Sequence, residues 1–319
     1  PEHIARITDF ADVSLGKGVV QCKDTPGFLA NRIGIFWMLV GLNEALRLGI
    51  AVEDADAVMS RPVGIPKTAL FGLFDLIGID LLPHIAKAML ATLPKPDRFR
   101  EIYQEPELIT KMIAEGYTGR KGKGGFYKLD KSGGKKTELA KDVITGEYAV
   151  AKKSTLASVS AAKGGLRVLV EHDDIGGQFA KSVLVQTLHY AASLIPEISD
   201  DIRNIDDAMK LGFAWKYGPF ELIDRLSTKE QTGADWLISA CAEAGLDVPA
   251  QLKAASGKTF YKTDDAYVSY LDADGQYQAI ITPSDKYKLL DVTRGKSPVL
   301  SKASAQLWDI GDDVACLQF

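Results

Sequence analysis

The sequence has few of the residues that build disulfide-rich or metal-binding proteins. Its three cysteines, Cys22, Cys241 and Cys316, lie far apart and form no CxxC pair. This spacing predicts neither a disulfide framework nor a zinc site, and it favours a reducing, cytoplasmic location. The four histidines show no HxxxH or HExxH spacing. We therefore expect them to be structural or solvated, and we expect no metal site.

Long apolar runs and an excess of one charge are also missing. The most apolar run, Ile33–Leu42, has ten residues, whereas a membrane span needs about 20, so it predicts a buried core helix. The 38 basic and 42 acidic residues give a net charge of -4 without a long basic run, so nucleic acid is not an expected partner. No charged segment followed by an apolar one opens the chain, and no secretory signal is expected.

The residues that are present indicate a mainly helical protein. With 319 residues, 46% of them hydrophobic, the chain is long enough for about two domains. Apolar residues at three-to-four spacing predict a helix over 4–15, followed by a short strand over Val19–Cys22. Further helices are expected over 53–59, 69–77 and 81–93.

One polar residue is out of place in the longest predicted helix. This helix is expected from Pro26 to Leu48, capped by Asp24 or Thr25 and ended by Gly49. Asn31 lies near its start although Asn is a poor helix former. Its side chain either satisfies a nearby backbone group or presents a carboxamide, with two donors and an acceptor in one plane, to a substrate.

The middle of the chain is rich in glycine and basic residues. Gly122–Gly125 could be a phosphate-binding loop or a plain basic turn; it lacks the GK[ST] ending and a preceding apolar strand. Lys131–Lys153 is polar with few large apolar residues, which predicts a domain boundary. Strands separated by turns are expected over 266–271 and 276–280, and again over 306–309 and 314–317. No sheet is visible in the sequence for the last hairpin to join, so we expect a C-terminal partner for it.

The sequence also repeats itself. At an offset of 150, five residues recur: Asp24, Gly27, Ala30, Asp56 and Met59 return as Asp174, Gly177, Ala180, Asp206 and Met209. After a one-residue gap, Phe71, Leu73 and Asp75 return as Phe220, Leu222 and Asp224. This pattern predicts two copies of one helical unit that pack face to face.

The segment Lys23–Arg32, KDTPGFLANR, resembles the entry to the C-terminal domain of 3-hydroxyacyl-CoA dehydrogenases, the NAD-dependent enzymes of fatty-acid β-oxidation. The resemblance continues through 119–127, 209–212 and 218–224, and it covers roughly residues 1–258. It implies a mainly α fold with two tandem helical domains of that type and a short β-containing C-terminal tail. The end of the chain resembles the first hairpin of an enoyl-CoA hydratase domain.

The resemblance implies a middle part of a bifunctional dehydrogenase–hydratase. We expect five segments: a remnant of a Rossmann domain (1–23), a first C-terminal dehydrogenase domain (24–128), a linker (129–154), a second, degenerate domain (155–258), and a linker with a hydratase-like hairpin (259–319). The N-terminal Rossmann domain, with its NAD site and catalytic His–Glu pair, and the hydratase domain would then lie outside this chain. The chain alone is expected to bind no cofactor and to be inactive.

The resemblance carries one functional residue over. Asn31 corresponds to an asparagine that helps to position the acyl-CoA substrate, whereas Lys181 stands at the equivalent place of the second copy, which is therefore expected to have no site. Arg120, Lys121 and Lys123 could contact the CoA phosphates. The competing hypotheses are a helical assembly module without substrate contact and a different two-domain dehydrogenase, such as a 6-phosphogluconate or hydroxyisobutyrate enzyme. The segment Gly218–Glu221 argues against the latter.

Overall fold

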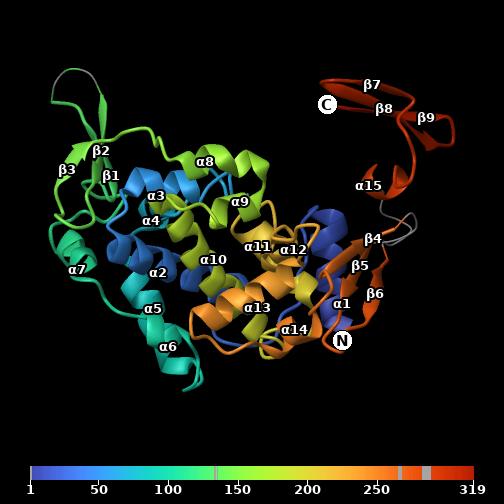
Figure 1. Cartoon of the computed structure of the whole chain (residues 1–319), viewed down its shortest axis with the longest axis horizontal. Coiled ribbons are helices and arrows are strands. Elements are labelled where there is room, and N and C mark those ends of the chain that lie inside the picture. Colours follow the sequence, from blue (N-terminus) through green and yellow to red (C-terminus); the bar gives the residue numbers. More distant parts are fainter. Residues whose placement is uncertain (1, 133, 135, 265–267, 282–288) are drawn as a thin grey trace.

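The computed structural model describes residues 2–132, 134, 136–264, 268–281 and 289–319. Within these ranges the fold is mainly α, with three antiparallel sheets of three strands each (Figure 1). The predicted fold class, helical with a β-containing C-terminal tail, is confirmed.

The first half of the chain alternates helices with short loops and ends in a sheet. Its elements are α1 (Glu2–Asp9), a π-helical turn η1 (Phe10–Ser14), α2 (Ala30–Leu48), α3 (Val52–Val58), α4 (Phe71–Ile77), α5 (Leu81–Thr92), α6 (Phe99–Ile102), α7 (Glu107–Ala114), β1 (Tyr127–Asp130), β2 (Thr137–Lys141) and β3 (Tyr148–Val150).

The second half also begins with helices and ends in strands. Its elements are α8 (Ala157–Ala161), a 3-10 turn η2 (Ala162–Gly164), α9 (Leu166–Val170), α10 (Ile175–Ser193), α11 (Ile202–Gly212), α12 (Pro219–Asp224), α13 (Gly233–Glu243), α14 (Ala250–Ala254), β4 (Tyr261–Thr263), β5 (Val268–Leu271), β6 (Tyr277–Ile280), α15 (Leu289–Val292), β7 (Leu300–Lys302), β8 (Ala305–Gly311) and β9 (Val314–Gln318).

Helix α2 starts four residues later than predicted. Gly27 and Phe28 have φ values of 77° and 50°, a left-handed conformation that an α-helix does not include, so a turn precedes the helix. The predicted caps, Asp24 and Thr25, are wrong, because no side chain caps α2. The predicted end is confirmed: Gly49 adopts φ 65° just after the last helical residue.

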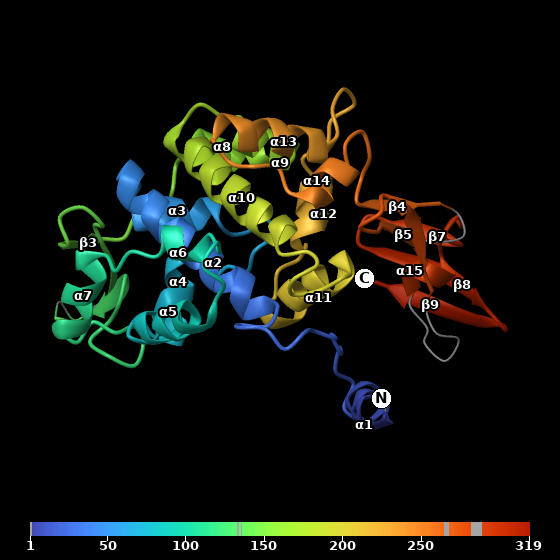
Figure 2. The same ribbon diagram turned by 90° about the horizontal axis from the view of Figure 1, so that it is seen from below.

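Helices α2 and α10 form the centre of the helical body, where they pack against each other (Figure 1, Figure 2). Both are buried on nearly every side, which explains why their hydrophobic residues follow no narrow stripe. The rings of Phe36 and Tyr190 stack between them with centroids 3.8 Å apart. The predicted buried core helix over Ile33–Leu42 is confirmed.

A buried arginine network fixes this packing. Arg32, on α2, is 0% exposed, and its Nε donates to the Tyr190 hydroxyl of α10 at 2.6 Å. That hydroxyl donates to Asp97 at 3.0 Å, and Arg32 also pairs with the carboxylates of Asp97 and Glu197. Its Nη1 donates to the Pro26 carbonyl at 3.2 Å. The buried charge is thus paired and hydrogen-bonded, as burial of an ion requires.

Each half of the helical body contains an equivalent carboxylate, half-buried at Asp56 and fully buried at Asp206. Asp56 accepts backbone N–H bonds from the start of α4 at 2.7 to 3.1 Å and one from the Tyr127 hydroxyl at 3.0 Å. Asp206 accepts two such bonds from the start of α12, at 2.8 and 3.2 Å, and one from the Tyr261 hydroxyl at 2.7 Å. Both side chains therefore supply acceptors to N–H groups that a helix start leaves unpaired.

A second carboxylate recurs at the other end of each short helix. Asp75 accepts the backbone N–H groups of Phe126 and Tyr127 at 2.7 and 2.8 Å, and Asp224 accepts those of Phe260 and Tyr261, both at 2.7 Å. Burial raises the pKa of Asp75 to about 6 and that of Asp224 to about 7. The identities behind the predicted repeat thus include residues that make the same contacts in both halves.

The strands shift the expected unit boundaries. The stretch 129–154, expected as a linker, contains β2 and β3, and the stretch after 258, also expected as a linker, contains β4 to β6. Because Tyr127 and Tyr261 make equivalent contacts, the strands that follow them are equivalent as well. The division into two units stays a prediction, with ends that these strands would move to about Val150 and Ile280.

Helix α1 lies apart from the helical body (Figure 2). The helix predicted over 4–15 is present as α1 and η1, and none of its residues is buried. The strand predicted over Val19–Cys22 is wrong: these residues are irregular. A strand needs a neighbour for its backbone groups, and none of the described strands pairs with this segment.

The predicted C-terminal hairpins are present where the structure describes them. Strands β5 and β6 confirm the first, whose residues 265–267 lie outside the described range. Strands β8 and β9 confirm the second, with Asp312 and Asp313 at φ 50° and 59°, as a tight hairpin turn requires. This hairpin does join a strand, since β7 pairs with β8.

Replacing Asp97 with alanine should lower the free energy of unfolding by about 3–5 kcal/mol, because it removes a carboxylate from a fully buried arginine. Urea denaturation measures the loss. The matched control is Asp200→Ala, which breaks an exposed pair with Lys23 and should cost less than about 1 kcal/mol. Equal losses in both variants would contradict the role given to the buried network.

The titration of Asp224 should make stability depend on pH. Its folded pKa of about 7 lies above the ordinary value of 3.8, so between these values the folded state binds more protons than the unfolded state. The free energy of unfolding should therefore fall as the pH rises from about 4 to about 7, by at most about 1.4 kcal/mol per pH unit from this group. Asp224→Asn should show a smaller slope in urea titrations at several pH values. Identical slopes would refute the assignment.

Candidate functional site

Asn31 lies on the first turn of α2 with its side chain exposed. Its carboxamide has no hydrogen-bond partner among the described residues, so it does not satisfy a nearby backbone group. The next residue, Arg32, points into the buried network. Successive side chains of a helix leave it at directions about 100° apart around the helix axis. Because Arg32 is anchored in the interior, Asn31 leaves the helix in a fixed direction toward the surface.

Apolar residues lie at the start of α2, close to Asn31 in the sequence. A β-carbon at Gly212 would lie 3.0 Å from the β-carbon of Ala30, so the end of α11 touches the start of α2. Two partly exposed hydrophobic side chains belong to these segments: Phe28, in the turn before α2, at 54% exposure, and Leu211, on α11 and next to Gly18, at 58%. An open, unpaired amide beside uncovered apolar groups can bind a polar group of a ligand whose chain is apolar.

The second copy differs at the position equivalent to Asn31. Helix α10 begins at Ile175, directly after the capping residue Asp174, so Lys181 lies in its second turn, whereas Asn31 lies in the first turn of α2. Its ammonium pairs with Glu243 at 2.9 Å. The side chain is thus engaged within the protein, in contrast to the amide of Asn31.

The basic residues of the central loop lie at a different place from Asn31. A pocket of about 1150 Å³ opens between α3, α4 and the sheet β1–β3. Arg120 and Lys123 line this pocket, whereas Lys121 and Asn31 do not. The structure therefore brings two of the predicted phosphate-contacting residues together and separates them from the predicted substrate-positioning residue.

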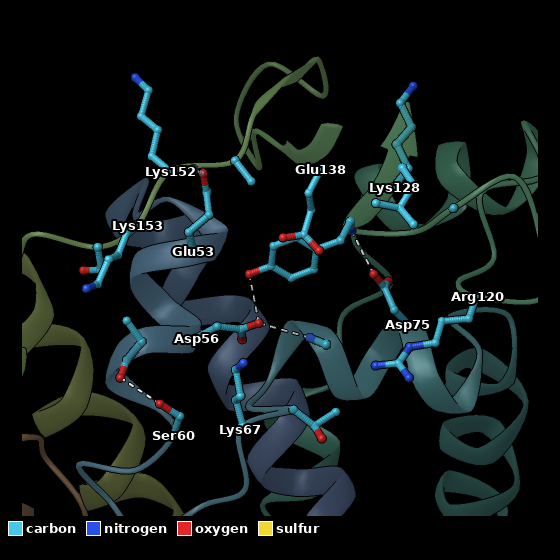
Figure 3. Close-up of a pocket in the computed structure, with 18 of the residues that line it drawn as sticks. Glu53, Asp56, Ser60, Lys67, Asp75, Arg120, Lys128, Glu138, Lys152 and Lys153 are labelled. Atoms are coloured by element: carbon cyan, nitrogen blue, oxygen red, sulfur yellow. Dashed lines mark hydrogen bonds between the residues drawn. The ribbon is translucent and has the colours of Figure 1, made fainter. Parts of the chain in front are cut away.

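The pocket has more positive than negative side chains. Its basic residues are Lys67, Arg120, Lys123, Lys128, Lys131, Lys152 and Lys153, and its acidic residues are Glu53, Asp56, Asp75 and Glu138. In Figure 3 the side chains of Lys67 and Arg120 point toward the interior from two sides, whereas those of Lys128 and Lys152 extend outward at the rim.

The acidic side chains on the pocket floor are occupied by internal hydrogen bonds. Burial raises the pKa of Asp56 to about 7. The backbone N–H groups and the Tyr127 hydroxyl favour the charged form and lower this pKa, but burial has the larger effect. Burial likewise raises the pKa of Asp75, and the nearby charge of Arg120 works in the opposite direction. None of the seven basic side chains makes a salt bridge with a described residue.

Sequence reasoning missed Lys67 and the pair Lys152–Lys153. These residues come from segments far from the central loop, and no local pattern indicates that they meet. One signal was available in the repeat: where the second copy has Lys210 and Glu221, the first has Ser60 and Gly72.

The described residues do not form a dinucleotide site of the Rossmann type. Dinucleotide sites of the Rossmann type need a parallel sheet with a glycine-rich turn, and every sheet in the described ranges is antiparallel. His189 is buried between Arg98 and the Asp247 carbonyl, and burial lowers its pKa. A sealed imidazole of this kind is not placed to take a proton from a substrate. The described part of the chain also holds no cluster of metal-ligating side chains and no helix able to cross a membrane.

Comparison with known families agrees with this architecture. Residues 27–129 match the family model of the 3-hydroxyacyl-CoA dehydrogenase C-terminal domain. This segment, which runs from the turn before α2 to β1, therefore belongs to that domain family.

Relatives extend the similarity to the rest of the chain. A Bacillus subtilis (strain 168) protein named "Probable 3-hydroxyacyl-CoA dehydrogenase" is 35% identical over 326 residues, which cover 100% of this chain and 40% of that protein. A Rickettsia felis protein named as a fatty acid oxidation complex trifunctional enzyme is 38% identical over a segment that covers 70% of this chain and 30% of that protein. The crystal structure of 3-hydroxybutyryl-CoA dehydrogenase from Escherichia coli K12 is 19% identical, with a TM-score of 0.46. The match covers 76% of this chain and 65% of the crystallised chain. The chain thus spans less than half the length of these two curated relatives.

Proposed function

We propose that this chain supplies the helical part of an NAD-dependent 3-hydroxyacyl-CoA dehydrogenase of fatty-acid β-oxidation. The observation that carries the proposal is the unpaired, exposed carboxamide of Asn31 on a rigidly held helix of the matching domain family. Asn31 binds the acyl-CoA substrate and holds it in position. Positioning of this kind assists a reaction through orientation.

In this proposal the proton-accepting group and NAD belong to parts of the enzyme outside this chain. Support comes from the antiparallel sheets of the described residues and from the fraction of each relative that the chain covers. The exposed apolar side chains of α1 and η1, among them Ile7 at 68% and Phe10 at 56%, are consistent with a neighbouring domain. We extend the proposal to the hydratase-like domain that the sheet β7–β9 would begin.

The pure chain should form no NADH from 3-hydroxybutyryl-CoA and NAD, because orientation without a proton acceptor and a hydride site gives no turnover. Absorbance at the NADH band measures the outcome. NADH formation in proportion to the amount of chain would overturn the division of labour proposed above.

In the complete dehydrogenase that contains this chain, Asn31→Ala should lower kcat/KM about tenfold, as expected for the loss of a hydrogen bond of about 1–3 kcal/mol to the substrate. Steady-state kinetics with a 3-hydroxyacyl-CoA provides the measurement. Lys181→Ala is the matched control, since Lys181 is held by Glu243, and its kcat/KM should stay within about twofold of the wild type. A larger loss of kcat/KM in Lys181→Ala than in Asn31→Ala would show that the substrate site belongs to the second copy and would contradict the proposal.

A helical assembly module is the second candidate, and the uncovered apolar face of α1 and η1 favours it. This function needs no contact between Asn31 and a substrate. The kinetic comparison separates the two candidates, because an assembly module predicts the same kcat/KM for Asn31→Ala and wild type.

A further inference from the structure

The two copies of the helical unit differ in the residues beside the equivalent aspartates Asp56 and Asp206. Around Asp206, Lys210 pairs with Glu221 at 2.8 Å and with Asp207 at 2.9 Å, so an internal ion pair fills the space beside the buried carboxylate. Around Asp56, the equivalent residues are Ser60 and Gly72, and the pocket of about 1150 Å³ opens there.

The backbone at Gly72 is not crowded by neighbouring atoms. A β-carbon at this residue would lie 3.7 Å from Thr68 Cγ2 and 3.8 Å from Asp56 Oδ2, which are ordinary contacts. The backbone at Gly72 therefore has room for a β-carbon, but the first copy has no side chain at this place. It retains the supporting Asp–Tyr hydrogen bond of the second copy, between Asp56 and Tyr127, and lacks the ion pair that would fill the place.

The charge around this space favours an anion. Seven basic side chains line it without salt-bridge partners among the described residues, against four acidic ones. Three of these four, Glu53, Asp56 and Asp75, already accept backbone N–H groups. Clustered like charges repel each other, and an anion that they share relieves this repulsion.

The arrangement of the cations indicates more than one anionic group. Lys67 precedes α4, Arg120 and Lys123 belong to the loop before β1, and Lys152 and Lys153 follow β3. These segments border different sides of a space much larger than one phosphate group. Of these side chains, those of Lys67 and Arg120 point inward (Figure 3), and arginine and lysine side chains that converge in this way are the usual partners of phosphate esters.

We propose that this pocket is a binding site for an organic phosphate with at least two phosphate groups. Lys67 and Arg120 hold the phosphates from two sides, and Lys123, whose ammonium also donates to the Glu115 carbonyl at 2.9 Å, adds a third donor from the loop. The site is separate from Asn31 and does not rest on the proposed function, because anion binding here requires no turnover. Two sources share this chemistry, the 3′-phosphorylated nucleotide part of CoA and a nucleoside triphosphate.

Isothermal titration calorimetry of the full chain with adenosine 3′,5′-bisphosphate, ATP and inorganic pyrophosphate tests the proposal. We expect saturable binding of at least one nucleotide that weakens as salt increases. Lys67→Gln and Arg120→Gln should each raise Kd about tenfold. The control, Lys121→Gln, removes a neighbouring charge that does not line the pocket and should change Kd less than twofold. Absence of binding by all three probes, or equal effects of the control and the pocket variants, would overturn the proposal.

The second copy provides a blocking variant. The double substitution Ser60→Lys with Gly72→Glu should place an ion pair like that of Lys210 and Glu221 in the pocket. It should keep the melting temperature near that of the wild type and abolish nucleotide binding. Unchanged binding in this folded variant would show that the nucleotide binds elsewhere and would refute the site.

The probes also separate the sources. Tighter binding of adenosine 3′,5′-bisphosphate than of ATP supports the site with a CoA-type ligand, and the reverse order supports it with a nucleoside triphosphate. Neither order depends on Asn31. Loss of kcat/KM in Asn31→Ala without nucleotide binding would therefore refute this pocket and leave the dehydrogenase proposal standing.

Discussion

The buried guanidinium of Arg32 is the interaction on which the geometry of the candidate site depends. It is held by Tyr190 on α10 and by Asp97 before α6, and it also binds the carbonyl of Pro26 in the turn that precedes α2. One charged group thereby fixes the start, the rotation and the packing partner of the helix. Because Asn31 directly precedes Arg32, the same network that buries the arginine holds the amide at the surface.

Asp56 and Asp206 make equivalent internal contacts in the two halves, but the residues around them differ. Asp56 and Asp206 stabilise the starts of α4 and α12 with backbone hydrogen bonds and a tyrosine hydroxyl. These contacts are internal and equivalent in both halves. The residues just outside them differ, and an ion pair with Glu221 in one half is replaced by an open basic pocket at Gly72 in the other.

Much of the helical fold could be predicted from the sequence, because apolar spacing and a glycine stop such as Gly49 are local signals. The start of α2 could not, since the left-handed conformation of Phe28 leaves no mark in composition. The strand at Val19–Cys22 was predicted from local preference alone, and strands also need a neighbour.

The sequence named Asn31, Arg120 and Lys123 as candidates, a role that stays a prediction, but it gave neither their geometry nor Lys67, Lys152 and Lys153. The direction of Asn31 depends on partners of Arg32 that are 65 and 158 residues away, and the pocket joins Arg120 to Lys152 across a sheet. Such contacts arise from tertiary packing. They are accessible to sequence reasoning only through comparison of the two copies.

The central claim is that a buried arginine network presents the amide of Asn31 to an acyl-CoA. The most direct measurement is the NMR signal of the Asn31 side-chain amide during titration of the isotope-labelled chain with acetoacetyl-CoA. The account predicts a progressive, saturable shift of this signal that is lost when the network is broken by Asp97→Ala. A stationary Asn31 signal, while signals elsewhere in the chain shift, would contradict it.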